Sequence, residues 1–460
     1  MEPWQMSAVR AASMVRGGEL SAAEVAESVL SRISAVNPAL NAIVQRADDD
    51  ARACAAAVDA GSPGGPLAGA TFTSKINTDH VPYPTTNGIK ALRDNIATVT
   101  HPVVRGLLDA GMSMVGRTNS PAFAMRFHTE NELHGETLNP HRRDISCGGS
   151  SGGAGAAVAT GMCHIGQGND VAGSVRWPAY MNGVIGLRPT VGRMPTGGTN
   201  PNPRGWSASM MSTQGPIART MADIRAGYDA MSAENWADPF WVPARREFPV
   251  PAKVRVALVI DDGLGVDDVV KENLRRVGRL LEDAGYEVVE TLPPMLETFF
   301  SLWKRVGVLD MVLGLVRMLP QIDDAGLTTA MTNWTNTFPE ATGETFLKAL
   351  QDRDMLIRAW NAFFAEHQLL VTPMMTKPTI PRAYDISHPD ASAELDDYGR
   401  WGVNLSAIAM PALAFPVGSH EGAPMGVQIA AHTWREDLIL AAGDALELRL
   451  GEVAPVDVAW

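Results

Sequence analysis

The sequence predicts an α/β protein, a single large domain in which a parallel or mixed central β-sheet is flanked by α-helices. The clearest evidence is a strand over 254–260, then apolar side chains at helical spacing, then a second strand over 286–289; the apolar stripe consists of Val270, Leu274, Val277 and Leu281. This order is typical of a sheet with helices packed on it. Length alone allows about three domains, but no linker, charge block or repeat separates compact units. Hydrophobic residues make up 45% of the 460 residues, enough for one large core. We therefore expect one domain over 1–460.

The N-terminal part is expected to be helical over 5–60, including the Ala-rich stretch 41–58. Ser21 precedes Glu24 by three residues, which is the pattern of a capping box. Apolar runs and turn residues then predict alternating strands and helices. In chain order these are a strand over 68–74 that would end beside Lys75, a helix over 102–110 with proline in its first turn, a strand over 112–115 and a helix over 154–160.

Residues 196–250 are rich in Gly, Pro, Asn and Trp, and we expect extended loops there, including the run 196–203. Residues 291–365 are expected to be helical. Within them, four charged residues interrupt the apolar stretch 299–319, which favours a buried or pocket-lining helix over a membrane-surface helix. The remaining predictions are strands over 369–372 and 425–430 and a closing helix over 436–446.

The composition excludes several classes of protein. The formal net charge is −13, which argues against a surface that binds nucleic acid or an anionic membrane. The N-terminus carries Glu2 and no apolar run, so we expect no secretory signal, and no stretch of about 18 uncharged apolar residues predicts a membrane span. We expect a cytoplasmic protein without nucleic-acid or membrane partners.

The three cysteines, Cys54, Cys147 and Cys163, are far apart and form no C-x-x-C pair. This spacing predicts neither a disulfide framework nor a zinc site. Cys147 lies beside a glycine turn, and we expect a small buried side chain there rather than a reactive thiol.

Two glycine turns that carry serine lie close together, GGSSGG over 148–153 and Ala-Gly-Ser over 172–174. Glycines let the backbone turn sharply and bring N–H groups close to a bound atom, as a nucleophile with an oxyanion hole requires. GGSSGG alone is typical of an ordinary loop. It also matches the G-x-S-x-G pattern twice, and it lacks the Gly-Lys-Ser/Thr ending of a phosphate-binding loop.

The longer pattern is more specific. GGSSGG is followed by GNDVAGSVRWPA over 168–179 and GVIGLRPT over 183–190, and it is preceded by Phe-Thr-Ser-Lys-Ile-Asn over 72–77. Lys75 precedes Ser150 by 75 residues, and Ser150 precedes Ser174 by 24. Together these motifs resemble the amidase signature family. The resemblance covers about 7–447, with a signature core over about 65–195 and a variable substrate-pocket region over about 196–420.

This resemblance implies a single α/β domain with a mixed central sheet, and a hydrolase that cleaves carboxylic amides without a metal or an organic cofactor. Amide hydrolysis needs a nucleophile, a base, an acid for the leaving amine and donors for the oxyanion. By their match to the motif, Ser174 is the nucleophile, Ser150 bridges lysine and nucleophile after a cis peptide bond, and Lys75 is the general base. The oxyanion hole would use backbone N–H groups of Val171, Ala172, Gly173 and Ser174.

The residues around these positions are expected to support them. Asp170 and Arg176 would brace the loop, and Ser151 would support Ser150 by a hydrogen bond. A lysine is a base only when neutral, and burial without a nearby carboxylate lowers its pKa. The chain departs from the family pattern at Ile76, where an acid is common, and at Ala172, where the first of two glycines is usual.

Several functions remain open at this level. We expect an amidase for a small apolar or aromatic amide, because 291–365 is rich in Met and aromatic residues. The alternatives are the glutamine-hydrolysing subunit of a tRNA-dependent amidotransferase, which needs partner proteins and a carboxylate site, and a non-catalytic binding protein on the same fold. A homodimer would fit the family. A Ser-His-Asp mechanism is also compatible with residue order, since four histidines follow the serines: His367, His388, His420 and His432.

Overall fold

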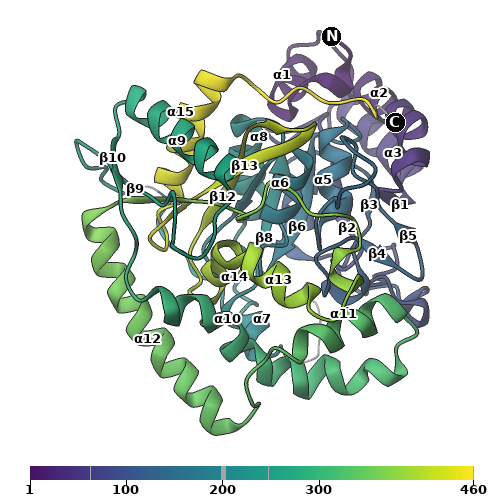
Figure 1. Cartoon of the computed structure of the whole chain (residues 1–460). Coiled ribbons are helices and arrows are strands. Elements are labelled where there is room, and N and C mark those ends of the chain that lie inside the picture. Colours follow the sequence, from purple (N-terminus) through teal and green to yellow (C-terminus); the bar gives the residue numbers. More distant parts are fainter. Residues whose placement is uncertain (63, 198–203, 247, 459) are drawn as a thin grey trace.

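A mixed sheet of eleven strands runs through the centre of the computed structural model, which describes residues 1–62, 64–197, 204–246, 248–458 and 460 (Figure 1). The strand order is β1-β3-β2-β6-β8-β7-β12-β13-β11-β9-β10. The pairs β3–β2, β2–β6, β11–β9 and β9–β10 are parallel, and the others are antiparallel. The strands are β1 Ile43–Arg46, β2 Thr71–Lys75, β3 Ser113–Thr118, β6 Ile165–Asp170, β7 Ile185–Arg188, β8 Thr213–Ala218, β9 Arg255–Leu258, β10 Glu287–Glu290, β11 Leu369–Thr372, β12 Ala412–His420 and β13 Ala423–Ala431.

Helices cover both faces of this sheet. Successive side chains of a strand point to opposite faces, so a strand that is apolar throughout contributes to a core on each side. Leu369 and Val371 of β11 belong to one hydrophobic core, while Leu370 belongs to another on the opposite face. The first core packs under α4 (Pro102–Asp109), α8 (Met221–Met231), α9 (Asp268–Asp283) and α15 (Glu436–Leu450). These observations confirm the α/β class and the mixed, helix-flanked sheet.

The opposite face has two groups of helices. Near the N-terminus lie α2 (Ala22–Leu40), α5 (Gly152–Ala159) and α6 (Arg176–Asn182), with α3 (Asp48–Asp59) beside α2. The N-terminal helix α1 (Ala8–Arg16) contacts α8 and contributes Ala8 to the first core. The helices drawn at the bottom of Figure 1 surround the second core. They are α7 (Trp206–Met210), α10 (Leu296–Met311), α11 (Ala325–Thr335), α12 (Gly343–Glu366), α13 (Ala391–Tyr398) and α14 (Arg400–Ala407). No helix in the described ranges is both long and apolar enough to cross a bilayer.

Several local predictions are confirmed. The Ser21 hydroxyl accepts the Glu24 N–H, and the Glu24 carboxylate accepts the Ser21 N–H at 2.7 Å, so the capping box begins α2 as expected. Pro102 lies in the first turn of α4. The strand over 369–372 has the predicted bounds, and the helices predicted within 291–365 and at 436–446 are present.

Two predictions are wrong. The stretch 41–58 is not helical throughout, because Asn41 ends α2 in the left-handed region (φ 54°) and β1 follows. There Ile43 pairs with Thr118 at the sheet edge, a long-range contact that overrides local helix propensity. The short helix α3 then begins with three aspartates, which suit a helix N-terminus.

The loop prediction for 196–250 is also wrong, because β8 and α8 lie within it. Pro216 sits inside β8 opposite Gln167 of β6, and β8 lies between β6 and β7. Proline is unusual in a central strand, which explains why the sequence pattern concealed it. The predicted run 196–203 falls largely outside the described residues, since 198–203 are not among them.

This topology brings the motif residues to one edge of the sheet. The parallel strands β2 and β6 end at Lys75 and Asp170, and α5 and α6 begin just after Ser151 and Val175. In α/β folds the carboxyl ends of parallel strands are the usual place for a site.

Candidate active site

Lys75, at the end of β2, is completely buried. Its Nζ lies within hydrogen-bond distance of three side-chain oxygens, Ser150 Oγ at 2.6 Å, Asn169 Oδ1 at 2.9 Å and Ser151 Oγ at 3.1 Å. It forms no ion pair with any carboxylate of the described residues. Burial lowers the pKa of the Lys75 ammonium well below its usual value of 10.5, and the charge of Asp170 opposes this shift only in part. A neutral amine that can accept a proton is therefore favoured at this position.

The GGSSGG loop packs too closely for side chains at its first two positions. A Cβ on Gly148, where φ is +78°, would lie 2.9 Å from Pro178 Cα, and a Cβ on Gly149 would lie 2.4 Å from the Arg126 carbonyl oxygen. The Gly149–Ser150 peptide bond is cis. The loop leads directly into α5, and it presents the Ser150 hydroxyl to Lys75.

The Ser174 turn is held from behind by Asp170. The Asp170 carboxylate accepts the N–H groups of Gly173 at 2.8 Å and Val175 at 3.3 Å. Arg176 donates to the same carboxylate at 2.9 and 3.0 Å, and Arg188 pairs with it at 3.3 Å. Although burial acts in the opposite direction, these two guanidinium groups hold the pKa of Asp170 below its ordinary value. Asp170 and Arg176 are both fully buried and fix the loop rather than facing the cavity.

The backbone donors around Ser174 differ in availability. The Gly173 N–H is already bound to Asp170, unlike the arrangement expected from the motif. In the described part of the chain, the N–H groups of Val171, Ala172 and Ser174 donate to no protein acceptor. Gly173 has φ +101°, and a Cβ there would lie 2.1 Å from the Trp177 ring. Ala172 is outside the positive-φ region, so its methyl group is compatible with the turn.

Ser150 and Ser174 open onto the same cavity, which has a volume of about 460 Å³. Ser174 is 9% exposed. Apart from the two serines, the polar residues of this cavity are Asn77, Asn169, Ser207, Ser212 and Asp310, and its larger apolar residues are Phe123, Met125, Val171, Trp303, Met311, Leu315 and Met318. Among the described residues, no lysine, arginine or histidine lines it, and Asp310 is its one charged side chain. We call it the serine cavity.

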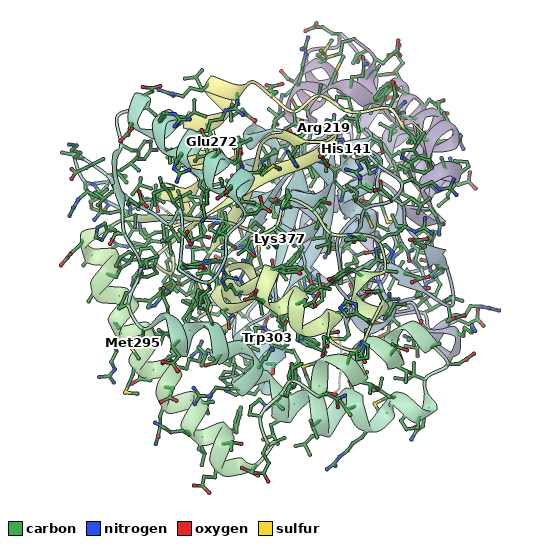
Figure 2. The ribbon with its side chains drawn as sticks, in the orientation of Figure 1. His141, Arg219, Glu272, Met295, Trp303 and Lys377 are labelled. Carbon is green, nitrogen blue, oxygen red and sulfur yellow. The ribbon has the colours of Figure 1, made fainter. Side chains whose placement is uncertain are left out.

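Trp303, on α10 in the lower half of Figure 2, forms part of this wall. Its indole Nε1 donates to the Val171 carbonyl at 2.8 Å, and its ring stacks on Trp334 with centroids 5.0 Å apart. Both rings also line a small recess of about 30 Å³ that includes Ser174 and Phe127. Trp303 therefore connects the distant helical region to the loop that carries Ser174.

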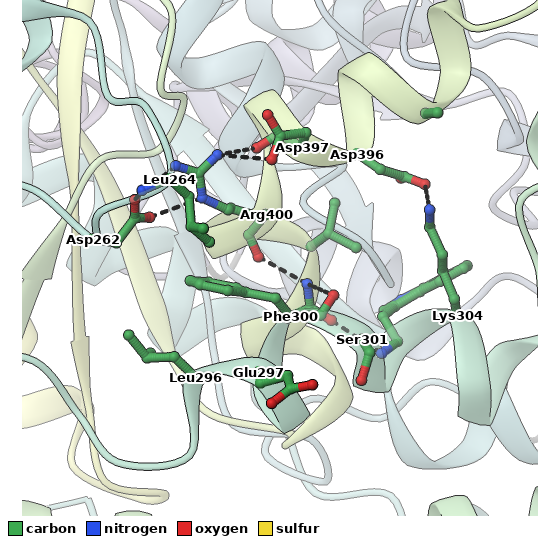
Figure 3. Close-up of a pocket in the computed structure, with 14 residues that line it drawn as sticks. Asp262, Leu264, Leu296, Glu297, Phe300, Ser301, Lys304, Asp396, Asp397 and Arg400 are labelled. Atoms are coloured by element: carbon green, nitrogen blue, oxygen red, sulfur yellow. Dashed lines mark hydrogen bonds and ion pairs between the residues drawn. The ribbon is translucent and has the colours of Figure 1, made fainter.

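A second cavity, of about 600 Å³, lies along the N-terminal part of α10, and Trp303 lines both cavities (Figure 3). Four of its charged residues form ion pairs, Lys304 with Asp396 at 2.9 Å and Arg400 with Asp262 at 2.8 Å. The Trp334 indole also donates to Asp396, at 2.6 Å. Asp396 thus joins α10 and α11 to α13, beside the stacked tryptophans, and the Arg400–Asp262 pair joins α14 to the segment after β9.

Three features of the site differ from the sequence-based expectations. The Ser151 hydroxyl accepts a bond from Lys75 rather than contacting Ser150. Ile76 is buried, and its hydrogen bonds are made by its backbone: its N–H donates to the Thr118 carbonyl, and its carbonyl accepts the Asn87 N–H. The hydrogen bonding around the base instead comes from Asn169, whose amide donates to Asn77 Oδ1 at 2.9 Å.

Asn169 and Trp303 were not among the predicted site residues. Asn169 precedes Asp170 in β6, so the alternation of strand residues turns it toward Lys75 on the side opposite Asp170. The two-residue alternation of a strand could therefore have indicated Asn169 from the sequence motif. Trp303 lies 129 residues after Ser174, and no local pattern links the two.

The alternatives to a lysine–serine site are a Ser-His-Asp mechanism, a reactive thiol at Cys147 and a metal site, and the described residues give little support to any of them. No histidine of the described residues lines the serine cavity or its recess, so a Ser-His-Asp arrangement is absent there. Cys147 is buried as expected; burial raises the pKa of its thiol to about 12, and Sγ donates to the Thr137 carbonyl. No cluster of three or more potential metal ligands occurs within the described ranges.

Comparison with known proteins identifies the family. The Amidase family profile matches residues 24–440. The chain is 38% identical to an indoleacetamide hydrolase of Bradyrhizobium diazoefficiens, over 98% of this chain and 88% of that protein. It is 32% identical to an acylamidase of Rhodococcus erythropolis, over 95% and 93% of the two chains. The solved structure of 6-aminohexanoate cyclic dimer hydrolase superposes with a TM-score of 0.83 at 26% identity, covering 99% of each chain. The predicted family, enzyme class and amide-hydrolysing activity are confirmed: this chain belongs to the Amidase family.

Proposed function

We propose that this enzyme hydrolyses the primary amide of a small apolar or aromatic carboxylic acid through an acyl-enzyme on Ser174. The observation that supports this best is the 2.6 Å hydrogen bond between Lys75 Nζ and Ser150 Oγ, beside a cavity that Ser150 shares with Ser174. A buried lysine with a lowered pKa is a suitable base for a serine hydroxyl.

In the first half-reaction, Ser174 Oγ attacks the amide carbonyl carbon. Its proton passes to Ser150, and the Ser150 proton passes to neutral Lys75. The negative charge that develops on the carbonyl oxygen is stabilised by the N–H groups of Val171 and Ala172, with Gly173 positioned by its bond to Asp170. The C–N bond then breaks, and the proton on Lys75 returns through Ser150 to the leaving nitrogen. Ammonia and an ester on Ser174 are the products.

In the second half-reaction, water attacks the ester carbonyl and gives a proton to the same relay. The bond to Ser174 breaks, and the serine oxygen recovers its proton from Lys75 through Ser150. The carboxylic acid leaves, so the sum is amide plus water to acid plus ammonia. No step in this sequence requires a metal or an organic cofactor.

The serine cavity supports an apolar acyl group. Its walls carry Phe123, Met125, Met311 and Leu315, and the absence of a lysine or arginine from its described lining disfavours a substrate with a free carboxylate. Glutamine carries such a group, so the amidotransferase alternative is not favoured. The hydrogen-bonded lysine and serines equally disfavour a non-catalytic binding protein. By analogy with the relatives, arylacetamides such as indoleacetamide are the first substrates to test.

The test combines labelling and turnover. A serine-directed fluorophosphonate, followed by peptide mass mapping, should modify Ser174 in the native enzyme and not in Lys75→Ala. Ammonia release from indoleacetamide and phenylacetamide should be lost in the same variant. An adduct on Ser150 instead, or full ammonia release by Lys75→Ala, would contradict the proposed roles.

We also infer a cytoplasmic location, a homodimeric assembly, and the division into a signature core over about 65–195 and a substrate-pocket region over about 196–420. The cavity supports the division, because Ser150 and Ser174 come from the first part, whereas Ser207, Trp303 and Asp310 come from the second. Sedimentation velocity would test the assembly: the mass of a dimer is expected, and the mass of a monomer would contradict it.

A further inference from the structure

Asp310 is the one charged side chain in the described lining of the serine cavity, and it lies at the C-terminal end of α10. Its Oδ2 accepts the backbone N–H of Ser207, in the first turn of α7. The carboxylate forms no ion pair with any cation of the described chain, and no hydrogen bond to Oδ1 is present in those residues. Within the described part of the chain, one carboxylate oxygen therefore caps a short helix, and the other keeps its accepting capacity.

The Ser207 hydroxyl lies in the same lining and is also without a partner. Its Oγ is buried, and no donor or acceptor of the described residues contacts it. The cavity lining around the two groups includes apolar side chains, notably Met311 at the end of α10, Leu315 in the π-helical turn that follows, and Met318 just after that turn. Asp310 and Ser207 thus form a polar pair in an otherwise apolar part of the cavity.

A polar group without a partner in such surroundings is costly, and a bound ligand that supplies the missing hydrogen bond recovers that free energy. An ionised carboxylate only accepts hydrogen bonds. It therefore selects a ligand with an N–H or O–H donor, and it repels a carboxylate or any other group that offers only lone pairs. A ring N–H satisfies this requirement while the rest of the ring contacts the methionine and leucine side chains.

We propose that Asp310, together with Ser207, is a specificity-determining site that binds a hydrogen-bond donor, a ring N–H, on the acyl part of the amide. This inference rests on the proposed function, because the amide group must lie at Ser174 while the donor lies at Asp310. The preferred substrate is then an amide of an N–H-bearing heteroaromatic acid rather than of a plain hydrocarbon acid.

The test uses two probes of nearly equal shape, indole-3-acetamide and 1-benzothiophene-3-acetamide, in which sulfur replaces the ring N–H. Calorimetric titration into Ser174→Ala measures binding without turnover. We expect the indole probe to bind about 10- to 100-fold more tightly, the range for a hydrogen bond to a charged group. In Asp310→Asn on the same background, the amide oxygen can still cap Ser207 while the NH₂ group faces the cavity. The indole preference should then disappear, with the affinity for benzothiophene within about twofold.

Two further variants separate recognition from structure. Asp354→Asn removes the same charge from the exposed surface of α12, where Asp354 pairs with Arg358, and it should leave the probe ratio unchanged. Ser207→Ala should lower the ratio, by less than Asp310→Asn. Equal affinities for the two probes in the Ser174→Ala protein would overturn the inference. So would an equal loss for both probes in Asp310→Asn, which would mean that Asp310 serves only to cap α7.

These measurements can contradict the recognition site and the proposed reaction independently of each other. If the native enzyme releases no ammonia from either probe but Ser174→Ala still prefers the indole, the proposed reaction is wrong and the recognition site stands. If the native enzyme hydrolyses both probes with equal kcat/KM and binding shows no preference, the proposed function stands and the recognition site is wrong.

Discussion

Two ionisable side chains beside the serine cavity, Lys75 and Asp310, have opposite surroundings. Lys75 is completely buried, and three side-chain oxygens lie within 3.1 Å of its nitrogen. Asp310 is half-buried and has one backbone partner among the described residues. The first belongs to a closed network that leaves no free hydrogen-bonding capacity, and the second keeps capacity for a ligand. In the proposed mechanism, the region around β2 and β6 carries out the reaction, while α7 and α10 select the substrate.

The largest expected effect comes from the closed network. Replacing Lys75 with alanine removes the proposed general base, and kcat should fall by about 10²- to 10⁴-fold, the usual contribution of such a group. The fold should persist, because the change removes a buried amine that prefers to be neutral. Initial rates of ammonia release, with thermal unfolding as the check on folding, measure this. Lys90→Ala, at an exposed ion pair, is the matched control and should retain full activity.

Asp170 provides the next test, because it holds the nucleophile loop without facing the cavity. Asp170→Asn removes the negative charge that Arg176 and Arg188 share, and two buried guanidinium groups lose their counter-ion. We expect the free energy of unfolding to fall by about 3–5 kcal/mol. Urea denaturation measures it. Asp144→Asn breaks the partly exposed pair with Arg142 and should cost at most about 1 kcal/mol. A similar small loss in both variants would mean that the Asp170 network does not support the loop.

The pH dependence tests the state of Lys75 directly. In the proposed mechanism the neutral amine is the active form, and burial lowers the pKa of Lys75 well below 10.5. Log kcat/KM should therefore rise by about one per pH unit below that pKa and then level off well before pH 10.5. The same shift has a stability consequence of defined sign. Between the folded and unfolded pKa values the unfolded chain binds more protons, so stability rises with pH there. Lys75→Met should abolish this contribution, and it should be more stable than the native protein on the acid side. A rate that climbs until pH 10.5 would show that the ammonium is not perturbed.

Much of the region around β2 and β6 could be predicted from the sequence, whereas much of the region around α7 and α10 could not. Lys75, Ser150 and Ser174 are brought to one sheet edge by short motifs, and Ser21, Pro102 and the strand 369–372 obey local rules. β8 could not be predicted, because Gly215 and Pro216 have low strand propensity. Pairing with β6 and β7, which the local sequence does not reveal, outweighs that propensity. Trp303 and Asp310 could not be assigned either, since helical periodicity predicts that a residue is buried and not which distant loop it meets.

Trp303 of α10 contacts the loop that carries Ser174, so its replacement tests whether the helical region affects the reaction as well as substrate binding. Trp303→Phe keeps an aromatic ring against Trp334 and removes the hydrogen bond to the Val171 carbonyl. One lost hydrogen bond is worth about 0.5–1.5 kcal/mol, so we expect a 2- to 10-fold fall in kcat. Stopped assays over a range of substrate concentrations separate kcat from KM. A change in KM alone would indicate that Trp303 only encloses the substrate and does not position the loop.

The smallest effect is expected at Ala172, where the chain departs from the usual pair of glycines. Because its φ is not positive, the turn does not require glycine there, and the oxyanion donor is a backbone group that the methyl does not touch. Ala172→Gly should leave kcat/KM within about twofold and lower stability by about 0.4–1 kcal/mol, through greater freedom of the unfolded chain. The neighbouring Gly173→Ala makes the contrast, since φ is +101° and the added Cβ would meet the Trp177 ring at 2.1 Å. It should abolish activity. If instead Ala172→Gly raised kcat/KM tenfold, the methyl would be restricting the oxyanion donors, and this position would belong with the residues that limit the reaction rate.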